Sequence, residues 1–168
     1  EFFNKSKNGK VLVSAPIVNE NKKSAYFYIS SPVKLNDNIT GVVFFKIDAK
    51  KLSDAVANIK IGDLGSTYLL DKNGRTIAYE EYESVLNEEK TTEEAKTDTE
   101  LKDLAAIETK MIAGETGYGK YNYYGENCIQ SYAPVKGTDG WSIAITMNQY
   151  EFSKNTVISI IILAIILV

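Results

Sequence analysis

Residues 127–153 read NCIQSYAPVKGTDGWSIAITMNQYEFS, and residues 24–53 read SAYFYISSPVKLNDNITGVVFFKIDAKKLS. Each stretch contains a strand-like run, a Pro-Val-Lys triplet, a short polar turn, a glycine, a second strand-like run and then a helix-like run. A repeated order of elements implies that one supersecondary unit occurs twice. The sequence therefore predicts two copies of the same sheet module, of which the second is the more complete.

The second strand-like run of the later copy fixes the type of sheet. Residues 141–147 alternate strictly, with Trp141, Ile143, Ile145 and Met147 on one face and small or polar side chains on the other. Such alternation is typical of a half-buried antiparallel strand. Together with the helix-like runs, it predicts an α+β fold built on antiparallel sheets.

Turn signals and apolar spacing place the remaining elements. Asn73-Gly74 lies between two apolar runs and predicts a tight hairpin, in which both central residues take a positive φ. We expect Ser31-Pro32 to end a strand, residues 41–47 to form a central strand, and Thr97 with Glu100 to form a capping box. The expected strands cover 10–18, 24–30, 41–47, 66–71, 76–79, 117–124, 127–135 and 141–147, and the expected helices cover 49–59 and 99–113.

Composition excludes several classes of function. The 168 residues include 19 basic and 22 acidic side chains, no histidine and one cysteine, with a net charge of −3. Without histidine, a Ser-His-Asp triad and Cys/His zinc sites are excluded, and one thiol cannot form a disulfide within the chain. The mild acidity argues against a nucleic-acid partner, which requires a basic patch. The sequence gives no reason to expect a cofactor or a metal.

Residues 80–103 form the most acidic part of the chain, with ten acidic side chains against three lysines. We interpret this segment as a solvated loop and helix face, with a cation-binding surface as the alternative. A hydrolase that uses a pair of carboxylates would have to draw them from the same segment. Because the segment is interpreted as solvated, it does not favour a hydrolase, and we expect that the protein is not an enzyme.

The chain ends in an apolar run, residues 157–168, which carries no charge. A complete membrane span needs about 20 apolar residues. The run could be part of such a span or a buried terminal helix. Because the run is apolar on every side, it favours the first part of a transmembrane helix. We expect residues 149–168 to form a stalk and the start of that helix.

The order of three stretches, 14–43, 59–74 and 133–145, resembles the double Cache sensor, the extracytoplasmic input region of bacterial chemoreceptors. The resemblance implies two PAS-like modules with helices flanking antiparallel sheets, and a C-terminal helix that leads into a membrane span. It implies a location at the cell membrane, with this region outside the cytoplasm. The implied parts are 1–48, the C-terminal part of the membrane-distal module; 49–60, a connecting helix; 61–148, the membrane-proximal module; and 149–168, the stalk and membrane segment.

The same resemblance implies a ligand site in the membrane-distal module. Phe2 and Phe3 resemble the aromatic pair that often lines the family's ligand pocket, although plain core packing is the alternative. Lys46 falls where amino-acid receptors of this family carry an aspartate that binds the ligand ammonium. A lysine repels an ammonium group and favours an anionic ligand such as a carboxylate, unless it is simply an exposed strand residue. Tyr26 and Tyr28 share one strand face and can line a pocket or only pack within the sheet.

The resulting functional hypothesis is the ligand-sensing region of a transmembrane chemoreceptor, in which a bound small molecule biases the position of the C-terminal helix. The same input region on a histidine kinase or a diguanylate cyclase is the first alternative. A membrane-anchored adhesive surface domain is the alternative of another class, and it would have no enclosed pocket. Receptors of this type signal as dimers, so we expect a homodimer in the full-length protein.

Overall fold

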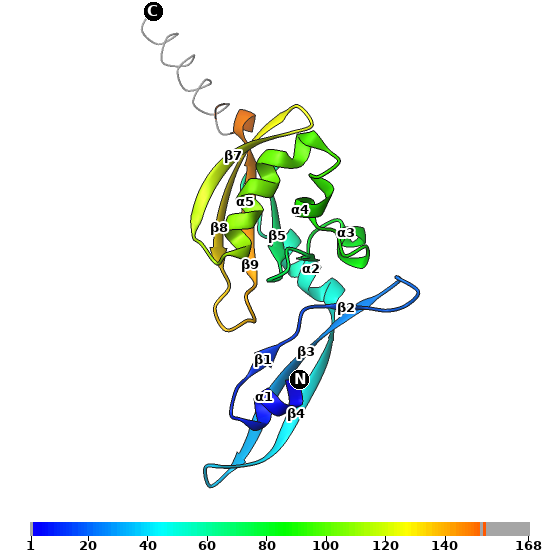
Figure 1. The fold of residues 1–168 in the computed structure, drawn as a ribbon, viewed down its shortest axis with the longest axis vertical. Helices are drawn as coiled ribbons and strands as arrows, with labels where there is room; N and C mark the ends of the chain where they lie inside the picture. The colour runs from blue at the N-terminus through cyan, green and yellow to red at the C-terminus, as the bar shows by residue number, and fades with distance from the viewer. Residues whose placement is uncertain (1, 152, 154–168) are drawn as a thin grey trace, which may run out of the picture.

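The structure, a computed structural model, describes residues 2–151 and 153. Two antiparallel sheets follow one another along the chain, and helices pack on them (Figure 1). The strands are β1 (Leu12–Val13), β2 (Ile17–Val18), β3 (Ala25–Leu35) and β4 (Asn38–Asp48) in the first sheet, and β5 (Ser66–Leu70), β6 (Thr76–Ala78), β7 (Gly117–Tyr123), β8 (Glu126–Pro134) and β9 (Ser142–Asn148) in the second. The helices are α1 (Phe2–Lys7), α2 (Ala49–Ala57), α3 (Tyr82–Leu86), α4 (Thr91–Glu94), the 3₁₀ turn η1 (Thr99–Leu101) and α5 (Lys102–Ile112). The predicted α+β class with antiparallel sheets is confirmed.

The first sheet is built around β3, which pairs with β1 and β2 along one edge and with β4 along the other. The expectation that Pro32 ends this strand was wrong, because β3 continues to Leu35. The pairing of β1 with β3 ends at Ser30, so beyond that point β4 is the one strand that pairs with β3 among the described residues. A proline lacks the N–H that a strand with two neighbours needs, but it is tolerated on a sheet edge.

Strand β4 lies at the edge of the first sheet and not at its centre, which corrects the second expectation for this region. Among the described residues it pairs with β3 only, through a hairpin whose turn is Asn36-Asp37. Phe44 and Phe45 are 44% and 56% exposed, so the apolar run on which the expectation rested is not enclosed. Apolar content alone therefore did not distinguish a buried strand from an exposed one.

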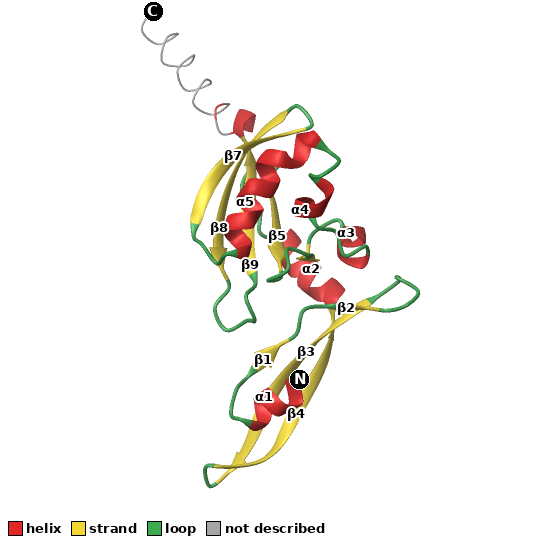
Figure 2. Ribbon diagram, viewed as in Figure 1, coloured by secondary structure: helices red, strands yellow, loops and turns green. Residues whose placement is uncertain are grey.

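The second sheet has the order β6-β5-β9-β8-β7 and carries helices on both faces (Figure 2). Successive residues of a strand point to opposite faces, and β5 shows the consequence. Leu70 packs with Met111 and other residues under α5, whereas Leu69 packs with Val56 of α2 on the other face. Trp141 belongs to the second cluster and meets Phe27 of the first sheet edge-on, with ring centroids 6.5 Å apart. One apolar cluster thus joins the two sheets.

Helix α5 lies close to β7 at Gly119, a strand residue without a side chain. A Cβ atom added there would lie 2.6 Å from Cδ1 of Ile107, which is itself buried. We expect Gly119→Ala to lower the free energy of unfolding by about 1–2 kcal/mol through overpacking. The measurement is urea denaturation, and Gly41→Ala is the matched control because nothing lies within 4 Å of its added Cβ. Equal stability of the two variants would contradict this close approach.

Two local details of the second sheet differ from expectation. In the Asn73-Gly74 turn only Gly74 has a positive φ, because Asp71 Oδ1 accepts bonds from the backbone N–H groups of Asn73 and Arg75 and so forms a longer loop. The expected Thr97–Glu100 capping box is replaced by Asp98, whose carboxylate accepts from the Glu100 N–H. Both corrections have one cause, an aspartate that binds backbone N–H groups two or more residues further along the chain.

The C-terminal expectations fall mostly outside the described residues. Residues 149–151 and 153 have helical backbone, while residues 152 and 154–168, which include the apolar run, are not described. In the part of the chain that the structure describes, no helix is both long and apolar enough to cross a membrane.

Candidate functional site

A cavity of about 510 Å³ lies in the second sheet's half of the molecule, lined by residues of β5, β7, β8, β9, α5 and the segment that contains α3 and α4. A volume of this size suits a small organic molecule. The strands supply its floor through side chains on the face that α5 covers, among them Tyr68, Tyr121, Cys128 and Thr146. Cys128 is partly buried and packs against the α5 cluster.

Glu108 is a buried carboxylate in the wall of this cavity. It lies on the sheet-facing side of α5, between Leu104 and Met111, and is only 2% exposed. Its Oε1 accepts hydrogen bonds from the Tyr68 hydroxyl (3.0 Å) and the Thr91 hydroxyl (3.1 Å). Its Oε2 is equally buried and has no hydrogen-bond partner among the described residues. Half of this carboxylate is therefore unsatisfied inside the protein.

Burial changes the acidity of Glu108. Loss of hydration raises the pKa of its carboxyl group from 4.5 to about 7, and the hydrogen bonds from Tyr68 and Thr91 offset only part of that rise. The nearby charge of Glu94 adds to the rise. Glu108 is therefore poised to change charge close to neutral pH.

A chain of hydrogen bonds connects Glu108 to the centre of the sheet. The Tyr68 hydroxyl lies 3.0 Å from both Oε1 of Glu108 and Oε1 of Gln130. The Gln130 oxygen also accepts from the Thr146 hydroxyl (3.2 Å), which in turn lies 3.3 Å from the Tyr121 hydroxyl. Burial raises the pKa of both tyrosines, so both phenols are neutral donors at neutral pH. The floor of the cavity is a connected polar network that reaches β9.

The polar face of β9 is its more deeply buried face. Ser142, Ala144, Thr146 and Asn148 are all buried, whereas the alternate apolar residues are partly exposed. The small side chains leave room for α5, and the Ser142 hydroxyl donates to the Met111 carbonyl (2.6 Å). The same face provides Thr146 and Asn148 to the cavity wall. The strict alternation expected in this strand is confirmed, and its small-residue side faces the site.

The chain leaves β9 through a turn that is bonded to the loop before β5. The Glu151 carboxylate accepts hydrogen bonds from the backbone N–H groups of Asp63 and Leu64, each 2.9 Å long. The Asn148 side chain accepts from the Tyr150 N–H (2.8 Å) and so begins the helical turn. These bonds therefore hold the segment that follows β9 against the loop that precedes β5.

Carboxylates and phenols also surround the mouth of the cavity. Glu81, Glu89 and Glu94 line it, all from the acidic segment that was expected to be solvated. The pKa of the Tyr123 phenol is raised by partial burial and then by the charges of these three glutamates. Tyr79 shows the same effect from burial and from Glu81. The expectation of solvation holds for much of the segment, but part of it borders this site.

A second cavity of about 430 Å³ lies between the two sheets, lined by residues 13–18 and by residues around Asp71 and Trp141. Arg75 is in its wall, but the guanidinium is already paired with Asp71 (2.9 Å) and with Glu88. The Arg75 side chain is 24% exposed. Because its charge is neutralised internally, this arginine is a structural element of the hairpin loop.

A family model for the Cache domain matches residues 1–156. The chain belongs to the Cache domain family. No match was found among curated protein sequences.

Solved structures share the fold of this Cache domain. The extracellular domain of mmHK1S-Z2, named as a histidine kinase, has 18% identity and a TM-score of 0.62, over 89% of this chain and 55% of the other. The ligand-binding domain of the Pseudomonas aeruginosa amino acid chemoreceptor PctB, in complex with L-Arg, has 18% identity and a TM-score of 0.57, over 88% and 58%. That of the Pseudomonas fluorescens chemoreceptor CtaA, in complex with L-isoleucine, has 16% identity and a TM-score of 0.61, over 91% and 59%. The chain thus spans a little over half the length of these domains.

Some of the site residues predicted for the first sheet lie close together. Tyr28 lies directly opposite Lys46 in the β3–β4 register, and the Lys46 Nζ lies 3.9 Å from the centre of the Tyr26 ring. Phe3 is 51% exposed and stacks on Phe44, with ring centroids 6.5 Å apart. The side chain of Phe2 lies outside the described part of the Cache domain. Phe3, Tyr26, Tyr28 and Lys46 do not line either of the two cavities, and the role of the predicted residues in binding stays a prediction.

The sequence interpretation missed Glu108, although the sequence contains a signal for it. Leu101, Leu104, Glu108 and Met111 follow the spacing of one helix face, and all four are buried. Burying a charged residue on an otherwise apolar face destabilises the folded protein, so such a residue is a candidate functional residue.

Proposed function

We propose that the chain is the extracytoplasmic ligand-sensing region of a transmembrane chemoreceptor, in which ligand binding displaces the segment that follows β9. The observation that carries the proposal is the shared role of β9. This strand supplies Thr146 and Asn148 to the larger cavity and continues directly into the C-terminal segment. A ligand that prefers one position of β9 would therefore bias the position of that segment.

Further parts of the proposal rest on the family resemblance and on the charge of Lys46. The sensing region would act without catalysis and would signal as a homodimer in the full-length protein, with its C-terminal segment in the membrane. A second ligand, for which an anionic small molecule is proposed, would bind the first sheet near Phe2, Phe3, Tyr26, Tyr28 and Lys46. The solved amino-acid complexes of PctB and CtaA support a small-molecule ligand for a domain of this fold.

A histidine kinase is the alternative output, because the extracellular domain of mmHK1S-Z2 shares this fold as the chemoreceptor domains do. An adhesive surface domain was expected to have no enclosed pocket; the two cavities described above are both open to solvent, so the thermal screen decides between this alternative and a sensor. Both receptor readings predict the same ligand-binding behaviour for this chain and differ only in the output domain.

The proposal is tested by ligand-induced thermal stabilisation of the chain. A broad set of amino acids, amines, carboxylates and sugars is added at concentrations of about 1–10 mM, and the melting temperature is measured. These concentrations are about 10–100 times a Kd of about 0.1 mM. A ligand present at about 100 times its Kd stabilises the folded state by about 2.7 kcal/mol, which raises the melting temperature by several degrees. A set in which no compound changes the melting temperature would oppose a sensor.

The output is then determined on the full-length protein in membranes. A compound found in the screen should change kinase control in reconstituted chemoreceptor arrays if the protein is a chemoreceptor. It should change autophosphorylation of the protein itself if the output is a histidine kinase. A compound that binds and changes neither would contradict both receptor readings.

A further inference from the structure

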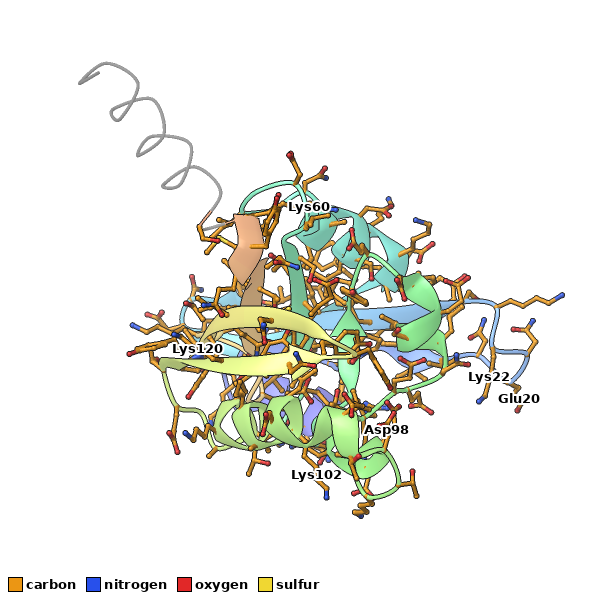
Figure 3. The ribbon with its side chains drawn as sticks, turned by 90° about the horizontal axis from the view of Figure 1, so that it is seen from above. Glu20, Lys22, Lys60, Asp98, Lys102 and Lys120 are labelled. Carbon is orange, nitrogen blue, oxygen red and sulfur yellow. The ribbon has the colours of Figure 1, made fainter. Side chains whose placement is uncertain are left out.

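The larger cavity is negatively charged. Among its lining residues in the described part of the chain, five are glutamates and none is lysine or arginine; the glutamates are Glu81, Glu89, Glu94, Glu108 and Glu126. Two lysines of neighbouring elements do not neutralise it: Lys60 pairs with Glu80 at 2.6 Å, and Lys102 on α5 points away from the sheet (Figure 3). A cleft lined by one sign of charge attracts ligands of the opposite sign.

The unpartnered oxygen of Glu108 identifies where a ligand donor is needed. Oε2 has no hydrogen-bond partner in the part of the chain that the structure describes, although Glu108 is only 2% exposed and lines the cavity. A buried acceptor without a donor destabilises the folded protein, and a charge-assisted hydrogen bond is the interaction that best offsets this cost. The Tyr68 and Thr91 hydroxyls both donate to Oε1, so Oε2 is the oxygen of this carboxylate that is left to accept from a ligand.

Aromatic rings complete the site. Five tyrosines line the cavity, and two pairs of them are in edge-on contact: Tyr68 with Tyr79 at 6.3 Å and Tyr123 with Tyr124 at 4.8 Å between centroids. The faces of tyrosine rings attract cations, particularly away from water. Rings and carboxylates together are the surroundings that suit an ammonium group on a short carbon chain.

We propose that the cavity between α5 and the second sheet binds a small protonated amine, whose ammonium donates to Glu108 while the tyrosine rings enclose its carbon chain. This assignment rests on the proposed sensing function and names the ligand class of one of its sites. A metal ion is the less suitable cation, because no group of three or more acidic or thiol side chains among the described residues is arranged to hold one. An anion would be repelled by the same glutamates.

The test compares matched probes on the 168-residue chain by isothermal titration calorimetry and thermal unfolding. The cationic probes are n-butylamine and 1,4-diaminobutane, the neutral probes are 1-butanol and 1,4-butanediol, and the anionic probe is butyrate. At pH 8 the amines should bind and raise the melting temperature, with affinities about tenfold or more above those of the neutral probes. Butyrate should not bind this cavity.

Glu108→Gln should weaken amine binding by about 10- to 100-fold, the loss expected for one charged hydrogen bond. The matched control is Glu115→Gln, because Glu115 is exposed just beyond α5 and does not line the cavity. Circular dichroism and thermal unfolding establish that each variant is folded. Equal amine affinity of Glu108→Gln and the unchanged protein would overturn the proposal.

The pH profile separates a direct role of Glu108 from a structural one. Amine affinity should fall as the pH is lowered through about 7, where Glu108 gains a proton while the amine stays charged. The other titratable groups that face Glu108 are Tyr68 from β5 and Glu94 from α4, and the raised pKa of Tyr68 keeps it neutral across this range. The fall should be absent in Glu108→Gln. An identical profile in both proteins would overturn the assignment.

The outcomes also separate this inference from the proposed function. If butyrate or another non-cationic compound stabilises the chain and the amines do not, the amine assignment fails and the sensing function stands. If no compound of the broad screen or of this set binds, both fail.

Discussion

Glu108→Gln is expected to raise the free energy of unfolding at pH 8 by about 2 kcal/mol. The raised pKa of about 7 in the folded state, against 4.5 for an unperturbed group, means that folding binds the proton more tightly. By linkage, the contribution of Glu108 to the free energy of unfolding is greatest below about pH 4.5. This contribution falls as the pH rises to about 7. The pKa difference corresponds to about 3 kcal/mol. An amide cannot ionise, so the variant avoids most of this loss.

The measurement is urea denaturation of both proteins between pH 5 and 8. The chain has no histidine, so the side chain that ordinarily dominates this pH range is missing and the contribution of Glu108 should be plain. Glu115→Gln should keep the pH dependence of the unchanged protein. A flat stability profile in the unchanged protein, together with no gain in Glu108→Gln at pH 8, would show that Glu108 has an ordinary pKa.

Trp141→Ala is expected to produce the largest loss of stability, about 3–5 kcal/mol, as for other buried aromatic residues. Trp141 is 5% exposed, packs in the cluster between α2 and the second sheet, and contacts Phe27 of the first sheet. Removing it should also separate the unfolding of the two sheets, because this cluster joins them. Chemical denaturation followed by circular dichroism measures the loss.

Tyr118→Ala is the matched control for Trp141→Ala, since Tyr118 is a strand aromatic that is 74% exposed. Its effect should stay within about 0.5 kcal/mol, as for most surface substitutions. Trp141→Phe should recover part of the lost stability, because a ring still fills much of the space. A loss in Trp141→Ala no greater than that in Tyr118→Ala would mean that the cluster does not join the sheets.

Periodicity in the sequence predicted the strands of the second sheet closely, because alternation and turn residues are local signals. The buried side of β9 was harder to predict, because burial there depends on α5 covering the small residues Ser142 and Ala144 rather than on apolar content. The edge position of β4 depends in the same way on which strands lie beside it. Strand pairing and coverage are non-local properties, and one sequence contains only weak signals for them.

The candidate site was predicted less well than the fold for a similar reason. The family resemblance directed attention to Tyr26, Tyr28 and Lys46, whose arrangement on one hairpin is seen while their binding role stays a prediction. The acidic segment was judged by its composition, which gives no information on which glutamates meet the cavity. Glu108 was the exception, because its position on an apolar helix face could have been recognised from spacing alone.

The hydrogen bonds to Glu151 connect one carboxylate to two segments of the chain. One segment is the loop from α2, which carries Asp63 and Leu64 and follows the first sheet; the other is β9, which ends three residues before Glu151. Movement of either segment would strain the same pair of hydrogen bonds. Displacement of either half of the molecule would therefore reach the same carboxylate at the point where the chain leaves the second sheet.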